Sequence, residues 1–375
     1  MIAAEDFERL IRQPVPALLA VASGLVLGLS IGWITGGRDT TSEVVTQVTV
    51  TENAPPPTVS STSGGSSQED DLPANPSGGT RAEMARWTST LRGAVRSAER
   101  LGGDAEAAVW LDGWPEPVTG GNASRRMRLW SLSKPPTAVA VLKRAGDPSA
   151  ALDDAIRAAI TRSENCRQRR VVLGLERLTG GAEGARAALG DVFRQAGADG
   201  VAISDSTAPA DVSCRTYLQA AGRGLPDPLG PALQLGTSEW TVRDGVAFMH
   251  ALGNGVYGEA GAKVQELMAL PKERSRELTS DNDFSAPSDW GAGRAFAGFP
   301  GLAYKAGWGG VAQGRFLAAQ AGIVPIGDRR AAVMAVFHPS TQPPSDDPGK
   351  TQGPKALEDM FRRMALQLRR SGATP

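Results

Sequence analysis

The stretch Ser131-Leu132-Ser133-Lys134 has the spacing S-x-x-K and opens a predicted helix. One helical turn separates the serine from the lysine, so we expect the lysine amine beside the serine hydroxyl. A lysine whose pKa is lowered by burial can act as the base for a serine nucleophile. Backbone N–H groups at the start of a helix can also hold an oxyanion. Ser131 is therefore the candidate nucleophile, and Lys134 is its candidate base.

Two further short motifs follow in the chain. Ser163-Glu164-Asn165 has the form S-x-N and comes after a predicted helix, where its serine can pass a proton to a leaving group and its amide can bind substrate. Lys305-Ala306-Gly307 lies on a predicted strand, where the lysine supplies positive charge and the glycine lets a substrate backbone approach. Taken alone, Lys134 is more often a solvated helix residue and Ser163 a helix cap. The order and context of the motifs favour one shared site.

Hydrophobic periodicity predicts the order helix, strands, several helices, strands and a last helix. The expected helices are 82–101, 134–143, 151–160, 183–195, 242–252, 261–270 and 355–370, and the expected strands are 107–111, 115–121, 303–307, 314–324 and 331–337. This order predicts an α+β fold. Its antiparallel sheet combines both chain ends and is covered by the N- and C-terminal helices, with a helical lobe inserted between. A site is expected between sheet and lobe.

With these motifs in order, residues Arg81 to Arg370 resemble the class A β-lactamase and penicillin-binding DD-peptidase superfamily. Residues 182–196 and Thr241 to Asp244 resemble stretches that flank the family's active-site loop. The resemblance implies that Ser131 is acylated, with Lys134 as its base.

The resemblance also assigns the remaining motif residues. Ser163 and Asn165 stand for the S-D-N elements, so Ser163 is expected to move protons and Asn165 to bind substrate. Lys305 and Gly307 stand for the K-T-G strand and are expected to bind substrate as well. The N–H groups of Ser131 and Trp308 are expected to form an oxyanion hole. No cofactor is implied.

Two departures from the family pattern bear on activity. Ala306 replaces the usual Thr or Ser and so lacks a hydroxyl expected to bind a substrate carboxylate. The loop from Gly222 to Trp240 contains no E-x-x-L-N, and its acids are Asp227 and Glu239, of which Glu239 is read as a helix-start residue. Because the family's deacylating water is held by the missing Glu, we expect a long-lived acyl-enzyme and poor β-lactam hydrolysis.

Two functions from different classes fit this sequence. The first is a serine hydrolase that transfers an acyl group through a Ser131 ester, on a peptidoglycan peptide or a related envelope acyl substrate. The second is a catalytically silent protein of the same fold that serves binding or scaffolding in the cell envelope. The ordered motifs favour the first, and the missing Glu and hydroxyl favour the second.

The N-terminal region predicts a membrane anchor. Residues 15–34 carry no charge and are long enough to cross a bilayer core as a helix. Arg9 and Arg12 precede this run, which predicts a cytoplasmic tail at 1–14 and a single-pass plasma-membrane protein with its bulk outside. The anchor contains two overlapping G-x-x-x-G units, typical of a helix-dimerisation face, although glycine is common in membrane helices generally. These glycines are Gly24, Gly28 and Gly32.

Composition sets the remaining expectations. Residues 35–80 are rich in Thr, Ser, Pro and Gly and are expected to form a disordered linker to a domain at 81–375. The formal net charge is +0, so nothing favours a nucleic-acid partner. The chain has two histidines and two cysteines without metal-ligand spacing, which makes a metal site unexpected. Cys166 and Cys214 are expected to form a disulfide outside the cell, with two buried thiols as the alternative.

Overall fold

A computed structural model describes residues 78–203, 238–272, 290–310, 316–339 and 348–371, which all belong to the unit Glu69–Pro375. The expected tail (1–14), anchor (15–34) and almost all of the linker lie outside these residues. Within the described ranges, no helix combines the length and the apolar character needed to cross a membrane. The first helix begins at Gly78, so the end of the expected linker belongs to the folded domain.

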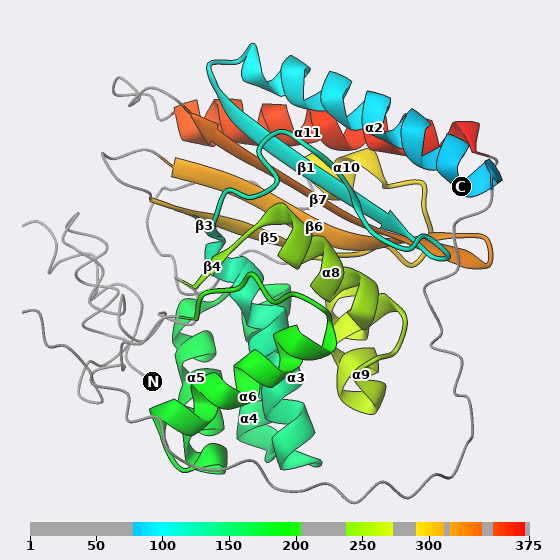
Figure 1. Cartoon of the computed structure of the whole chain (residues 1–375). Helices are drawn as coiled ribbons and strands as arrows, with labels where there is room; N and C mark the ends of the chain where they lie inside the picture. The colour runs from blue at the N-terminus through cyan, green and yellow to red at the C-terminus, as the bar shows by residue number, and fades with distance from the viewer. Residues whose placement is uncertain (1–77, 204–237, 273–289, 311–315, 340–347, 372–375) are drawn as a thin grey trace, which may run out of the picture. The chain divides into compact units, whose positions relative to one another are not determined.

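A five-stranded antiparallel sheet forms the centre of the fold, with the strand order β2-β1-β7-β6-β5 (Figure 1). The strands are β1 (Gly103–Leu111), β2 (Val118–Gly120), β5 (Ala303–Gly310), β6 (Phe316–Ile326) and β7 (Arg329–Pro339). Strands from both ends of the described chain pair through β1 and β7, as the element order predicted. Because β5 lies at one edge of this order, one of its sides has no neighbouring strand among the residues that the structure describes.

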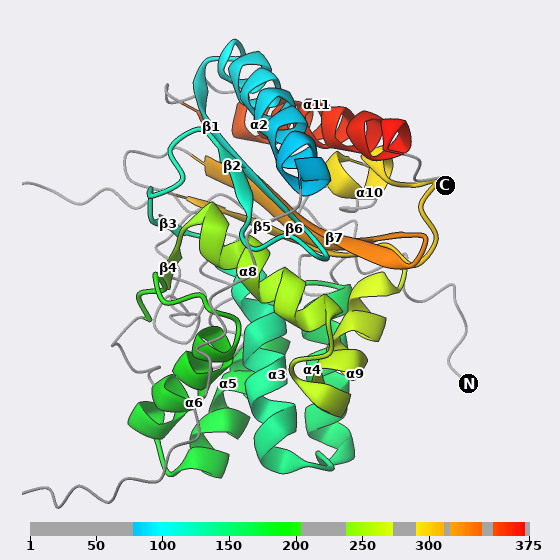
Figure 2. The ribbon, with the colours of Figure 1, turned by 45° about the vertical axis from the view of Figure 1, so that its right-hand side comes forward.

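The N- and C-terminal helices cover one face of the sheet (Figure 2). They are α2 (Gly78–Glu99) and α11 (Pro348–Arg370), and the short α10 (Gly291–Ala295) packs against α11. Aromatic and aliphatic side chains fill this layer, with Trp87, Phe296 and Phe361 completely buried. The α+β architecture expected from the sequence is therefore confirmed.

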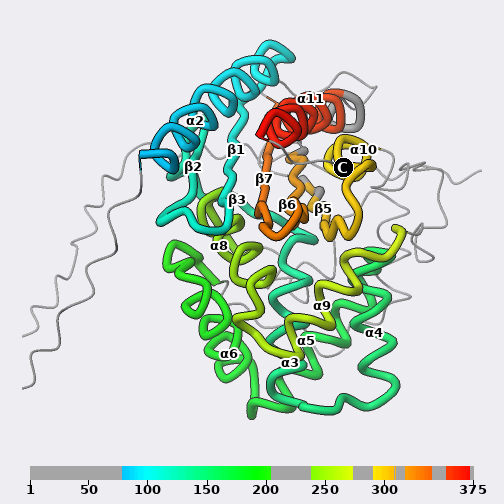
Figure 3. Tube along the Cα trace, turned by 90° about the vertical axis from the view of Figure 1, so that its right-hand side faces the viewer, coloured from blue at the N-terminus to red at the C-terminus, as the bar shows by residue number. Residues whose placement is uncertain are grey.

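The inserted helices form the lobe on the other face of the sheet (Figure 3). They are α3 (Lys134–Ala145), α4 (Ala150–Thr161), α5 (Asn165–Thr179), α6 (Ala182–Gln195), α8 (Val242–Gly253) and α9 (Gly258–Ala269). Helix α8 lies directly on the sheet, because a Cβ at Gly245 would stand 2.1 Å from the sulfur of Met334 in β7. Glycine at this position permits the close contact.

Alternation along the strands decides which side chains face the lobe. In β5, Tyr304 and Ala306 belong to the core under α2 and α11, whereas Ala303 belongs to the core of the lobe. Successive side chains of a strand point to opposite faces, so Lys305 and Gly307 lie on the lobe side. The sheet register therefore directs two of the candidate site residues towards the helices that carry the other candidates.

Several elements differ from the sequence prediction. The helix α5 was not predicted at all, and neither was α10. Glu239 does not start a helix: it lies in the short strand β4 (Glu239–Trp240), which pairs with β3 (Met127–Arg128). Helix α8 begins after Thr241, whose side chain accepts a hydrogen bond from the N–H of Asp244 while the Asp244 carboxylate accepts from the N–H of Thr241. This reciprocal cap explains why the helix starts after Glu239.

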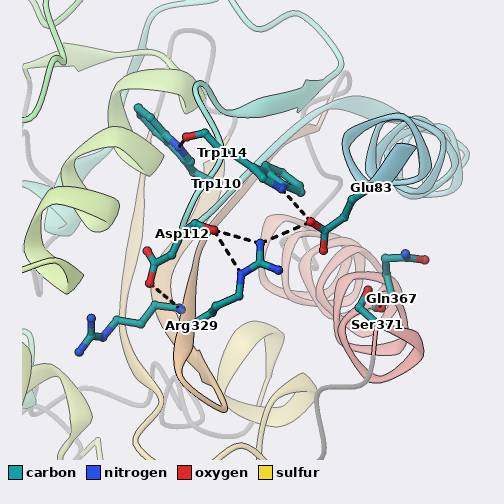
Figure 4. A network of polar contacts seen from close by, with 8 residues as sticks. Glu83, Trp110, Asp112, Trp114, Arg329, Gln367 and Ser371 are labelled. Carbon is teal, nitrogen blue, oxygen red and sulfur yellow. Dashed lines mark hydrogen bonds and ion pairs between the residues drawn. The ribbon is translucent and has the colours of Figure 1, made fainter. Parts of the chain in front are cut away.

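A polar network ties the N-terminal helix to two turns of the sheet (Figure 4). Trp114 Nε1 donates to Glu83 of α2 at 2.9 Å, and Arg329 forms an ion pair with the same carboxylate. The Arg329 guanidinium also donates to the backbone oxygen of Asp112, and the Trp110 indole donates to the oxygen of Trp114. These contacts fasten α2 to the β1–β2 and β6–β7 connections.

Candidate active site

The S-x-x-K motif occupies the turn that leads into helix α3. Residues Trp130–Ser133 form a single 3₁₀ turn, and α3 starts at Lys134 with prolines in its first turn. Proline fits there because the first N–H groups of a helix have no partner within the helix. Lys134 Nζ lies 3.0 Å from Ser131 Oγ, and the lysine side chain is 1% exposed. The expected proximity of hydroxyl and amine is present.

Lys134 also connects this turn to the S-x-N motif. Its amine contacts the Ser163 backbone oxygen at 2.7 Å, Ser163 Oγ at 3.2 Å and Asn165 Oδ1 at 2.9 Å. An ammonium has three N–H donors, and with Ser131 Oγ four oxygens stand within hydrogen-bonding distance. In the structure the Lys134 amine donates to Ser131 Oγ; to act as a base for this hydroxyl, Lys134 would have to be a neutral amine that accepts from it.

Lys305 approaches Ser163 from β5. Its amine donates to Ser163 Oγ at 2.9 Å and to the Ala306 backbone oxygen at 3.0 Å, and the side chain is 2% exposed. Burial lowers the pKa of Lys305 well below its ordinary value, and the positive charges of Lys134 and Lys272 lower it further. Ser163 Oγ is thus shared by two buried amines.

Backbone strain occurs at two residues of this cluster. Among the described residues, Trp130 and Ser163 are the non-glycine residues with a positive φ, at 48° and 56°. Such a conformation costs about 1–3 kcal/mol and persists where the surroundings hold it, often at functional sites. Ser163 follows the C-terminus of α4, a position where left-handed glycine is common, and its carbonyl and hydroxyl both bind Lys134.

The edge of β5 borders the same turn. Because the Ala306 carbonyl accepts from the Lys305 amine, we infer that it points to the unpaired edge, and alternation directs the Trp308 N–H the same way. A Cβ at Gly307 would stand 2.2 Å from the oxygen of Leu129. Substrate binding at Gly307 stays a prediction, and the absence of a side chain there also admits the chain just before Ser131.

Four expected site residues, Ser131, Ser163, Asn165 and Lys305, thus meet directly or through Lys134. Sequence reasoning missed Lys272, which lies just after α9. Its amine donates to the backbone oxygens of Met268 and Leu270 at 2.5 and 3.2 Å and stands 5.0 Å from the centre of the Tyr304 ring. A lysine that follows a helix and a proline, here Pro271, is typical of a solvated loop, so the burial of Lys272 could not be predicted from the local sequence.

Lys272 makes stability depend on pH. Burial lowers its pKa from 10.5 to about 7, so between these values the unfolded chain binds a proton that the folded chain does not. Stability then rises with pH across this window, by up to about 1.4 kcal/mol per pH unit. Relative to wild type, Lys272→Met should be most stabilising near pH 7. About 4 kcal/mol of this difference in unfolding free energy should be lost by pH 10.5. Urea denaturation at several pH values measures this.

Lys263 of the neighbouring helix α9 provides the matched control, since Lys263→Met removes a partly exposed charge that pairs with Asp153 at the surface. Its free-energy difference from wild type should stay nearly constant over the same pH range. A Lys272→Met difference that is equally flat would show that this amine is charged in the folded protein throughout.

Two further expectations concern cysteine and metal. Cys166 lies on α5 and is 8% exposed, and no cysteine of the described residues is a free thiol. Cys214 lies outside those residues, so the disulfide stays a prediction. The described part of the chain contains no group of His, Cys, Asp and Glu side chains that could hold a metal ion.

Comparison with known proteins adds a likeness in fold. No protein-family model matches the sequence, and no curated protein matches it significantly. The chain is similar to class A β-lactamases and penicillin-binding transpeptidase domains. A β-lactamase from Sphaerobacter thermophilus is 18% identical over 76% of this chain and 98% of its own, with a TM-score of 0.48. A β-lactamase from Streptosporangium roseum is 16% identical over 76% and 100%, with a TM-score of 0.49.

A third similar structure represents the transpeptidases. The transpeptidase domain of a D,D-transpeptidase from Legionella pneumophila is 15% identical over 76% of this chain and 96% of its own, with a TM-score of 0.46. At these identities the likeness concerns the fold alone. The case for chemistry therefore depends on the contacts among Ser131, Lys134, Ser163, Asn165 and Lys305.

Proposed function

We propose that this protein is a serine acyltransferase or hydrolase that works through an ester on Ser131. The observation that carries the proposal is the position of Lys134 Nζ, which is 3.0 Å from Ser131 Oγ and 3.2 Å from Ser163 Oγ inside a buried cluster. A nucleophile within hydrogen-bonding distance of a base that other groups orient is the pattern of covalent catalysis.

In the proposed first step, Ser131 Oγ attacks the carbonyl carbon of the substrate while its proton passes to the neutral amine of Lys134. The electron pair of the carbonyl moves to its oxygen, and the N–H groups of Ser131 and Trp308 hold the resulting oxyanion. When the intermediate collapses, the bond to the leaving group breaks. Ser163 gives its proton to that group and recovers one from Lys134, which took it from Ser131 and lies within hydrogen-bonding distance.

The substrate that fits best is an acyl compound with an anionic group. Lys305 is buried, its hydrogen-bond acceptors are Ser163 Oγ and the Ala306 oxygen, and its amine lies 2.9 Å from the former. An anion bound beside this amine would favour its charged form. A carboxylate-bearing peptide of the cell envelope has this chemistry, and the uncharged run at 15–34 supports a location outside the plasma membrane.

Loss of the acyl group is expected to be slow. The loop from Gly222 to Trp240 lacks the E-x-x-L-N that would place a general base for water. Transfer to an amine or slow hydrolysis would then complete the cycle, and an acylated β-lactam would stay on the protein. Efficient destruction of β-lactams is not part of the proposal.

A binding or scaffolding role is the second candidate, and Ala306 is the observation that favours it. This residue lacks a hydroxyl, and its methyl group belongs to the apolar core under α2 and α11. Under this alternative the lysine–serine cluster would be a structural remnant, and Ser131→Ala would leave partner binding unchanged.

Intact-mass spectrometry of the full chain after incubation with benzylpenicillin tests the proposal. We expect one added penicilloyl group on the wild type, held for many minutes, and none on Ser131→Ala. Ser133→Ala is the matched control: it removes the neighbouring hydroxyl, which donates to the Trp130 oxygen, and should still be acylated. Failure of both penicillin and a p-nitrophenyl ester to label Ser131 would overturn the proposal. The same mass measurement also tests the expected Cys166–Cys214 disulfide. If it is formed, an alkylating agent should add no mass to the protein unless a reductant is present.

A further inference from the structure

The residue before the candidate nucleophile is a strained tryptophan. Trp130 starts the 3₁₀ turn with a φ of 48°, which is rare for a bulky side chain. Its indole is half-buried and packs against the core of the lobe. The indole Nε1 is buried and has no hydrogen-bond partner among the described residues, and the contacts that hold the ring there are packing contacts. A conformation this unfavourable requires a contact that maintains it.

Gly309 of β5 supplies that contact. A Cβ built on Gly309 would stand 2.2, 2.3 and 2.4 Å from Cε2, Cδ2 and Nε1 of the Trp130 ring. The indole therefore rests directly on the glycine backbone, where any larger residue would collide with it. Gly307 makes a similar contact with the oxygen of Leu129, at 2.2 Å from its own missing Cβ. The two glycines flank Trp308, and the two residues they contact directly precede Ser131.

We propose that the Trp130 indole is a spacer that sets the distance between the backbone N–H groups of Ser131 and Trp308. The Ser131 N–H belongs to the peptide bond that follows Trp130, and the Trp308 residue is joined by one peptide bond to Gly309. A rigid ring between Trp130 and Gly309 thus fixes the two donors relative to each other. This inference rests on the proposed function and names Trp130 as a positioning residue for its oxyanion hole.

The chemical consequence concerns the step that forms the oxyanion. Ser131 Oγ forms a bond to the ester carbon, its proton passes to Lys134, and negative charge develops on the former carbonyl oxygen. Collapse then expels p-nitrophenolate from a p-nitrophenyl ester. A loss of one well-placed donor to such an oxyanion reduces the rate by about 10²–10³-fold. Without the indole, β5 can shift towards the turn, and the N–H groups of Ser131 and Trp308 then no longer point at the position of the oxyanion.

Paired oxygen and sulfur esters separate this role from general support of the fold. The probes are p-nitrophenyl acetate and its thiono analogue, in which the carbonyl oxygen is sulfur and accepts hydrogen bonds weakly. Trp130→Ala should slow acylation by the oxygen ester about 10²-fold and change acylation by the thionoester much less. Trp130→Phe, which keeps an aromatic ring on Gly309, should recover most of the rate. Trp110→Ala removes a similarly half-buried indole in β1 and should leave the oxygen-to-sulfur rate ratio unchanged.

A thermal-unfolding cycle tests the packing without relying on activity. Gly309→Ala in the wild type should lower Tm by about 5 °C or more, because the new methyl group meets the indole. In the Trp130→Ala background the same substitution should cost much less, since the space is vacant. This non-additivity is the signature of a direct contact between the two residues.

The outcomes distinguish the two proposals. If the wild type shows no Ser131-dependent acylation, the proposed function falls and the spacer role falls with it. If the wild type is acylated but Trp130→Ala leaves the oxygen-to-sulfur ratio unchanged, the spacer role alone is overturned. Additive effects of Trp130→Ala and Gly309→Ala on Tm would equally overturn it.

Discussion

Lys134→Met should slow acylation of Ser131 by about 10³–10⁴-fold, because a positioned general base contributes up to this much. Methionine keeps the length and the apolar part of the side chain, so α3 retains its packing. The amine that lies 3.0 Å from Ser131 Oγ is lost, and water cannot readily replace it where the side chain is 1% exposed. The rate of labelling by a fluorescent penicillin measures the effect.

The same substitution should also lower stability. The Ser163 backbone oxygen, Ser163 Oγ and Asn165 Oδ1 each lose the Lys134 donor, although Ser163 Oγ keeps its hydrogen bond from Lys305. A buried acceptor that is left unsatisfied costs about 1–3 kcal/mol, so the loss at the Ser163 backbone oxygen lowers stability. Part of this loss of stability is offset, because the variant no longer buries the lysine amine, which is itself unfavourable. Lys143→Met in the same helix is the control, since Lys143 is exposed and bonds Gln195 at the surface. Labelling at the wild-type rate in Lys134→Met would remove Lys134 from the mechanism.

The sequence predicted the site better where its residues follow local rules. Ser131 and Lys134 lie one turn apart on the same segment, so helical geometry alone brings them together. Lys305 faces the lobe because strand alternation puts it opposite Tyr304 and Ala306. That Lys305 then reaches Ser163, far away in sequence, followed from the family resemblance and not from any local pattern.

The helix α5 was missed for a physical reason. Its first half carries Arg167, Gln168 and Arg169, which read as a polar loop, yet Gln168 and Arg169 are buried against the rest of the lobe. Burial of polar side chains depends on partners from distant elements, and a sequence window does not contain them. The C-terminus of this helix does have a sequence signal, because Gly180 terminates it with a φ of 79° and glycine is the usual residue at such a position.

Backbone strain is equally invisible in sequence. A positive φ is suggested by glycine or asparagine, but here it occurs at Trp130 and Ser163. Neither residue type predicts the conformation, because tertiary contacts impose it: Gly309 against the indole, and Lys134 on both oxygens of Ser163. Both strained residues adjoin or belong to the candidate site, which is where such strain is generally retained.

Ser163→Ala and Ser163→Gly should each slow acylation by about 10²–10³-fold, to within a few-fold of one another. Both remove the hydroxyl that two buried amines share, at 3.2 Å from Lys134 Nζ and 2.9 Å from Lys305 Nζ. They differ only in the backbone. At a φ of 56° alanine keeps the strain, whereas glycine relieves it, so the glycine variant should be more stable by about 1 kcal/mol.

Ser97 in α2 provides the matched pair, because its backbone is helical and there glycine should be less stable than alanine by about 1 kcal/mol. Urea unfolding of all four variants measures the difference in stability between alanine and glycine at each position. Labelling rates measure the effect of the Ser163 variants on acylation. Equal stability of the two Ser163 variants would mean that the strain is absent in solution. Retention of the wild-type labelling rate in Ser163→Gly would instead take the hydroxyl out of proton transfer and leave Lys134 to protonate the leaving group directly.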